Sequence, residues 1–192
     1  MKILVFDTET TGLPTNWSAA EDDLSAWPRL VELAWIVIDE NDNEVSSNEF
    51  IVKPNNFLIP KRVSDFHKIT TEKALLEGKN INLVLDKFEK DINNSYLIVA
   101  HNIAYDYPVL NCEFIRSNFK SKITNLSKCC TMKTSIDFCN IKNKSHGKKY
   151  PKLRELHFKL FGSYFENAHR ALNDAKATCK CYVELKKRNI IG

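Results

Sequence analysis

The stretch KILVFDTETTG, residues 2–12, combines a candidate buried strand with two closely spaced acids. Its first part, Lys2 to Phe6, is β-prone and almost wholly apolar, which is typical of a strand covered on both faces in the middle of a sheet. Asp7 and Glu9 follow, and side chains two residues apart on a strand point the same way. Carboxylates this close repel one another unless a cation lies between them, and their oxygens suit Mg²⁺ or Mn²⁺. The stretch indicates a metal site, although a solvated acid pair would show the same pattern.

Hydrophobic periodicity in the rest of the chain predicts further strands and helices. The strands are expected at Leu30 to Asp39, Val45 to Lys53 and Tyr96 to Ala100. The helices are expected after Thr70 or Thr71, from Ile81, from about Asp106 to Phe119, around Leu153 to Leu160, and from Ala171 to Val183. The first three strands would form an antiparallel meander, and a strand, helix, strand order then adds a parallel pair. The chain of 192 residues is therefore expected to form one α/β domain over residues 1–192.

Two later clusters also place acids beside the ends of strands or helices. His101 to Asp106 follows the strand that ends at Ala100, and Pro108 suggests that a helix begins around Asp106. Asp106 could therefore be a plain N-cap as readily as a functional acid. His169 and Asp174 are five residues apart and would not share a helix face, so His169 is expected in the loop that enters the helix. Taken singly, each of these residues could be structural.

Composition narrows the class of protein without deciding its activity. The net charge of +4 permits a polyanionic partner, and the lysine-rich stretch from Asn140 to Pro151 is either a solvated loop or a contact to substrate phosphates. The six cysteines lack the paired spacing of a zinc site and are expected to be reduced thiols. No segment has the length of a signal h-region or a membrane span. A soluble, cytoplasmic protein is expected, and the residues after Phe6 lack the G-x-G-x-x-G of a dinucleotide-binding enzyme.

Three blocks of the sequence resemble the exonuclease motifs of the DnaQ-like DEDDh family, which is named for four acids and a histidine. They are FDTETTG (6–12), HNIAYD (101–106) and HRALNDA (169–175), and the segment HKIT (67–70) is similar to a further family feature. The matching positions are Asp7, Glu9, Asp106, His169 and Asp174. Tyr105 stands where the family often has phenylalanine, and Lys68 replaces a usual glycine. The resemblance implies a ribonuclease H-like fold, with a mixed five-stranded sheet of an antiparallel meander plus parallel strands flanked by helices.

The resemblance implies a two-metal, metal-dependent 3′–5′ exonuclease that releases nucleoside 5′-monophosphates from the 3′ end of single-stranded DNA or RNA. Two Mg²⁺ or Mn²⁺ ions would be held by the four acids: Asp7 bridges them, Glu9 and Asp174 hold one, and Asp106 supports the other. His169 would be the general base, because histidine accepts protons near neutral pH. Substrate-binding residues are expected at Thr8, Thr10, Thr11, Gly12, Leu13, His67, His101, Asn102 and Tyr105.

Two other functions would use the same residues. A catalytically silent module that binds nucleic acid or a protein partner could keep the fold, but it would be expected to have lost at least one of the five motif residues. A phosphodiesterase acting on small nucleotides could employ the same carboxylates. Competition between an oligonucleotide and a mononucleotide substrate would separate that activity from an exonuclease.

Overall fold

The computed structural model describes residues 2–145, 147–166 and 168–191, and its centre is a mixed sheet. The strand order is β3-β2-β1-β4-β5. The strands are β1 (Lys2–Thr10), β2 (Leu30–Ile38), β3 (Glu44–Ile51), β4 (Ser95–Ala100) and β5 (Ser127–Cys130). β1 pairs antiparallel with β2, which pairs antiparallel with β3, whereas β4 pairs parallel with both β1 and β5. The expected meander with added parallel strands is confirmed.

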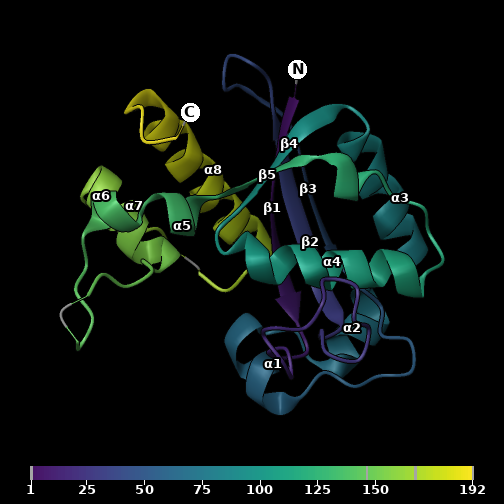
Figure 1. Ribbon diagram of the computed structural model, residues 1–192. Coiled ribbons are helices and arrows are strands. Elements are labelled where there is room, and N and C mark those ends of the chain that lie inside the picture. Colours follow the sequence, from purple (N-terminus) through teal and green to yellow (C-terminus); the bar gives the residue numbers. More distant parts are fainter. Residues whose placement is uncertain (1, 146, 167, 192) are drawn as a thin grey trace.

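Helices cover both faces of this sheet and one of its ends (Figure 1). They are α1 (Lys61–His67), α2 (Thr71–Glu77), α3 (Ile81–Ile92), α4 (Ile103–Arg116), α5 (Thr131–Thr134), α6 (Ile136–Cys139), α7 (Leu153–Phe161) and α8 (Ala171–Lys187). Helices α3 and α4 lie on one face, and α8 with α5 to α7 lies on the other (Figure 1). Helices α1 and α2 gather beyond the carboxyl end of β1, so this end of the sheet is bordered by structure on three sides.

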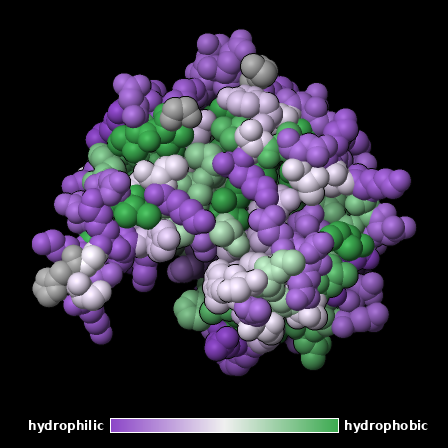
Figure 2. Space-filling model, in the orientation of Figure 1, coloured by the Kyte–Doolittle hydropathy of each residue, from purple (hydrophilic) through white to green (hydrophobic). Residues whose placement is uncertain are grey.

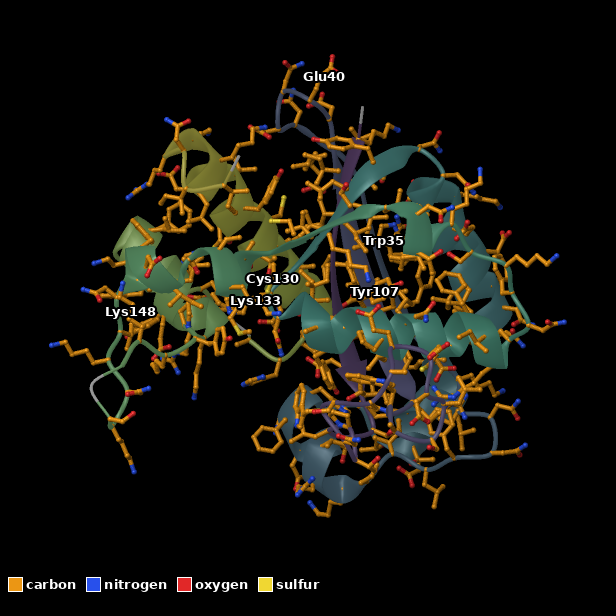
Figure 3. The ribbon with its side chains drawn as sticks, viewed as in Figure 1. Trp35, Glu40, Tyr107, Cys130, Lys133 and Lys148 are labelled. Atoms are coloured by element: carbon orange, nitrogen blue, oxygen red, sulfur yellow. The ribbon has the colours of Figure 1, made fainter. Side chains whose placement is uncertain are left out.

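The central strand β1 divides the core into two clusters by alternation of its side chains. Leu4 and Phe6 belong to the cluster under α3 and α4, together with Trp35, which lies between the sheet and α3 in Figure 3. Ile3 and Val5 belong to the cluster under α7 and α8. The same period of two sends the side chains that follow alternately to the two faces. Odd-numbered residues at the end of β1 therefore face α8, and even-numbered ones face α4.

Helix α4 begins earlier than the sequence indicates. The expected start near Asp106 is wrong, because the helix begins at Ile103 and contains Pro108 in its interior. Asn102 makes this possible by adopting a left-handed conformation (φ 77°), which turns the chain sharply from β4 into the helix. Asp106 is consequently not an N-cap. It lies one turn inside α4 with a buried side chain.

Two broader expectations can be compared with the described residues. All six cysteines are free thiols, and Cys112, Cys130, Cys139 and Cys181 are buried as small core side chains. The α-helices of the described segments include none that is both long enough and apolar enough to cross a membrane.

Candidate active site

Three carboxylates meet where the end of β1 faces the start of α8. Asp7 and Glu9 come from the odd-numbered face of β1, and Asp174 comes from the first turn of α8. One oxygen from each of Asp7, Glu9 and Asp174 lies within 4.8 Å of the other two. The period of β1 and the packing of α8 on the same face therefore bring together acids that are far apart in sequence.

The electrostatics of this group favour a bound cation. Burial, followed by repulsion from Asp106 and Asp174, raises the pKa of Asp7 well above its ordinary value. Burial and the neighbouring acids also raise the pKa of Glu9 to about 8, and burial raises that of Asp174. Charges of one sign held this close favour protonation unless a cation compensates them. Hard carboxylate oxygens in this arrangement fit a divalent ion such as Mg²⁺ or Mn²⁺.

Asp106 approaches the same place from the opposite face of the sheet. Thr8, on the even-numbered face of β1, donates to Asp106 Oδ1 from its backbone N at 3.1 Å and from its hydroxyl at 2.7 Å. Burial raises the pKa of Asp106 to about 7, and the hydrogen bonds from Thr8 oppose this rise. Asp106 lines a cavity of about 230 Å³ together with Asp7, Glu9, His169 and Asp174. All five motif residues thus border one space, which we call the carboxylate cavity.

His169 lies in the loop before α8, as its spacing from Asp174 predicts. Its backbone has a left-handed conformation (φ 70°), and its N–H donates to Asp174 Oδ2 at 2.7 Å. The imidazole is exposed, and its ring meets the ring of Phe66 from α1 edge-on, with 6.1 Å between centroids. Asp174 therefore fixes the backbone of the histidine while the side chain borders the carboxylate cavity.

Glu32, for which the sequence analysis predicts no role, holds the start of α8 in place. It is fully buried in β2, directly opposite Glu9 in the antiparallel register. Its carboxylate accepts from the backbone N of Ala171 at 2.9 Å and pairs with Arg170, also at 2.9 Å. Arg170 extends to Glu49 at 3.0 Å. These contacts fix Arg170 and Ala171. His169 directly precedes this pair and Asp174 follows it in the first turn of α8, so Glu32 is a positioning residue.

A second cavity of about 450 Å³ opens beside the carboxylates, and we call it the terminal cavity. Six of the residues predicted to bind substrate line it: Thr8, Thr10, Gly12, Leu13, His67 and Tyr105. The other residues that line it are Glu9 and three residues of α1, namely Arg62, Val63 and Phe66. In the space-filling view a notch separates the part of the molecule that holds α7 from the part that holds α1 (Figure 2). The shape and mixed lining could hold one nucleoside.

Tyr105 fixes the turn that forms one wall of the terminal cavity. Its hydroxyl donates to the carbonyl of Gly12 at 2.6 Å and contacts the hydroxyl of Thr10. A phenylalanine, frequent at this position in the resembling family, could not make either contact. Lys68, the other departure, ends α1 in a left-handed conformation (φ 61°), where glycine has no steric penalty.

The remaining predicted substrate residues have other partners or other places. His101 and Asn102 line the carboxylate cavity, but both ring nitrogens of His101 are engaged, by the Thr131 hydroxyl and the Pro151 carbonyl, each at 3.0 Å. Burial lowers the pKa of His101 to about 4. Thr11 accepts from the backbone N of Arg29 at 3.0 Å and does not line either cavity within the described residues. Their roles in binding substrate stay predictions.

His67 lines the terminal cavity, but its imidazole is buried. Its Nδ1 accepts from the backbone N of Ile69 at 3.1 Å, so the ring proton of the neutral form lies on Nε2. That buried Nε2 has no hydrogen-bond partner of normal geometry among the described residues. Burial lowers the pKa of His67, and the Thr10 backbone opposes this only in part. The Thr10 backbone thus interacts with this buried, neutral imidazole.

The raised pKa values predict how the metal-free protein responds to pH. Glu9 titrates near 8 and Asp106 near 7 in the folded state, against 4.5 and 3.8 as ordinary values. Between the ordinary pKa of each acid and its raised pKa in the folded state, the folded protein binds more protons than the unfolded chain. The free energy of unfolding should therefore fall as pH rises through this range. In EDTA, the melting temperature should be several degrees lower at pH 8.5 than at pH 6, and Glu9→Gln should reduce the difference. Equal pH dependence in wild type and Glu9→Gln would contradict the assignment.

Comparison with known proteins agrees with this geometry. A model of the family described as exonuclease matches residues 4–182. The chain belongs to this exonuclease family. A PolC-type DNA polymerase III of Clostridium perfringens (strain 13 / Type A) is 30% identical over an alignment of 183 residues, which covers 92% of this chain and 11% of that polymerase. The match thus covers a small part of the polymerase.

Solved structures share the fold of this exonuclease family member. The structure of E. coli exonuclease I in complex with a dA16 oligonucleotide has a TM-score of 0.76 and 20% identity, covering 97% of this chain and 41% of the other. The zinc-bound form of the complex of E. coli exonuclease I with single-stranded DNA has a TM-score of 0.73 and 20% identity, covering 97% and 40%. The expected ribonuclease H-like fold is confirmed by these likenesses.

Proposed function

We propose that this protein is a metal-dependent 3′–5′ exonuclease that releases nucleoside 5′-monophosphates from single-stranded nucleic acid. The observation that carries the proposal is the convergence of Asp7, Glu9 and Asp174 beside a nucleoside-sized cavity. Asp106 and His169 border the same space. Membership of the exonuclease family supports the reaction class. The complexes of exonuclease I with single-stranded oligonucleotides support the form of the substrate.

Divalent ions would be held by the oxygens of Asp7, Glu9 and Asp174, with Asp106 supporting a second ion from the α4 side. Two such ions supply Lewis acidity that stabilises the charge developing on the phosphate and on the departing oxygen. Mg²⁺ and Mn²⁺ both suit an all-oxygen donor set. The raised pKa values of Glu9 and Asp106 mean that binding such ions also releases protons.

The reaction is hydrolysis of the phosphodiester before the last nucleotide. A water oxygen forms a bond to phosphorus, the bond from phosphorus to the 3′ oxygen of the preceding nucleotide breaks, and that oxygen leaves as a 3′-hydroxyl after protonation. His169 takes the proton from the attacking water, because its exposed ring borders the carboxylate cavity and its backbone is fixed by Asp174. Leu13 and Tyr105 hold the nucleoside part of the terminal nucleotide in the terminal cavity.

The terminal cavity supports removal of one nucleotide at a time from a strand end. It lies directly beside the carboxylates and shares Thr8, Glu9 and Tyr105 with the carboxylate cavity. A volume of about 450 Å³ suits one nucleoside rather than an extended strand. One nucleotide is then removed per reaction, from the end that enters this cavity.

A degradation panel tests the proposal and its metal requirement. Matched DNA and RNA oligonucleotides, labelled at the 5′ end and blocked at either end, are incubated with Mg²⁺, Mn²⁺ or EDTA. We expect ladders shortened by single nucleotides from a free 3′ end, release of nucleoside 5′-monophosphates, and no release in EDTA. A block at the 3′ end should stop the reaction, and one at the 5′ end should not. Release in EDTA, or shortening from a blocked 3′ end, would overturn the proposal.

A further inference from the structure

A third cavity continues the line of the first two on the side of α7. It has a volume of about 260 Å³ and is lined by Lys152, Leu153, Arg154, Tyr164, Phe165, Ala168, His169 and Asp174. It shares Leu153, His169 and Asp174 with the carboxylate cavity, which in turn shares other residues with the terminal cavity. The three spaces therefore form one track with the carboxylates in the middle. We call the third space the α7 cavity.

The α7 cavity carries positive charge, unlike the acids beside it. Lys152 and Arg154 bring two positive charges, and neither forms an ion pair with an acid within the part of the chain that the structure describes. Lys148 and Lys149 of the neighbouring loop differ, because they pair with Asp137 and Glu155, each at 2.6 Å. Lys148 lies well out on that loop in Figure 3. Lys152 and Arg154 are thus available to a ligand in this cavity, whereas Lys148 and Lys149 are already paired.

An aromatic platform lies beside these cations. The ring of Tyr164 is 55% exposed and stacks on Phe158, with 4.8 Å between centroids. The guanidinium of Arg154 lies 4.6 Å from the centre of the Tyr164 ring. The ring is therefore supported by α7. Exposed rings beside unpaired cations are the usual means by which proteins hold single strands.

From this arrangement we propose that the α7 cavity binds the nucleotide on the 5′ side of the scissile phosphate, an assignment that rests on the proposed exonuclease function. Tyr164 stacks on its base, and Arg154 and Lys152 neutralise the next phosphate along the strand. The direction follows from charge. A nucleoside in the terminal cavity adds no phosphate beyond the scissile one, and Arg62 is the one arginine or lysine among the described residues lining that cavity. Each nucleotide on the other side adds one phosphate and needs a cation.

Two substrates separate this site from the chemistry itself. Thymidine 5′-p-nitrophenyl phosphate has a nitrophenol in place of the upstream nucleotide, whereas the oligonucleotide dT10 extends through the α7 cavity. For full-length Tyr164→Ala and Arg154→Ala, we expect kcat/KM for dT10, relative to that for the ester, to fall about 10-fold through KM. Tyr164→Phe should restore the ratio. Lys159→Ala removes a charge from α7 without touching the cavity and should leave the ratio at the wild-type value.

Salt dependence gives a second readout that a merely structural role would not change. The affinity of 5′-fluorescent dT10 is measured by anisotropy in EDTA at several salt concentrations. Arg154→Ala should lower the slope of log affinity against log salt by about 0.7, as expected for the loss of one phosphate contact. Unchanged ratios and slopes in both Tyr164→Ala and Arg154→Ala would overturn this site. A wild-type protein that hydrolyses neither substrate would instead overturn the proposed function.

Discussion

Asp7→Asn is expected to lower the rate of nucleotide release by about 10³-fold or more, because loss of one electrostatic contact to a transition state already costs about 10²–10³-fold. Asp7 lies at the centre of the acid group, where Asp106, Asp174, Glu9 and Glu32 all raise its pKa. Removing it takes away the acid that interacts with every other carboxylate of the group. Glu9 and Asp106 would remain to hold an ion, but neither occupies this central position.

The same substitution should make the metal-free protein more stable. Repulsion among the buried acids opposes folding at neutral pH, and an amide of the same shape removes part of it. In EDTA at pH 8, the melting temperature of Asp7→Asn should be several degrees above that of the wild type, since about 1 kcal/mol shifts it by roughly 2–4 °C. Asp86→Asn changes an exposed acid on α3 and is the matched control. A variant that loses activity together with stability would instead indicate a structural role for Asp7.

Glu32→Ala is expected to destabilise the protein by about 3 kcal/mol, the order of cost for breaking a buried charge pair or leaving a buried donor unsatisfied. The backbone N of Ala171 would lose its acceptor, and Arg170 would keep Glu49 as its partner. The start of α8 would then be less well fixed. Activity should fall together with stability, because Arg170 and Ala171, which Glu32 holds, lie between His169 and Asp174.

Thermal unfolding and nucleotide release, both with Mg²⁺, measure this effect. Glu32→Gln keeps an acceptor for Ala171 and should fall between wild type and Glu32→Ala. Glu49→Gln is the matched control, because it removes the half-exposed partner of the same arginine, and surface pairs contribute only about 0–1 kcal/mol. If Glu32→Ala and Glu49→Gln melted at the same temperature, the anchoring role of Glu32 would be excluded.

The sequence predicts four of the five strands well. The expected ranges of β1 to β4 agree with the observed ones to within a few residues, because β-prone runs flanked by polar turns define these strands. β5 was not located, since Ser127–Cys130 is a short and largely exposed strand at the edge of the sheet. α1 was also missed, because it is one of the shorter helices and its Pro60 N-cap makes no side-chain hydrogen bond.

The candidate site was predicted as a set of residues but not as a geometry. The three motif blocks predict one site composed of Asp7, Glu9, Asp106, His169 and Asp174. The structure places these five residues around one cavity. The sequence did not reveal that Asp106 belongs to the opposite face and is held by Thr8, because that depends on which helix covers which face.

Glu32 is harder to recognise from the sequence. A single acid in the apolar run LVELAWIVI resembles a residue at a solvated edge. The sequence still contains a signal, because an acid in a strand buried throughout its length needs a partner. That partner, Arg170, lies in the third motif block, where the family resemblance implies roles only for His169 and Asp174.

The division of the site between β1 and α8 also determines when the protein can first act. During synthesis Asp7 leaves the ribosome long before His169 and Asp174, which follow after more than 160 residues. At about 5–20 residues per second, this interval is roughly ten to thirty seconds. Throughout it, the growing chain has acids on β1 but lacks the base and the third carboxylate. A protein whose site is divided in this way can complete that site only after the segment that forms α8 has been synthesised.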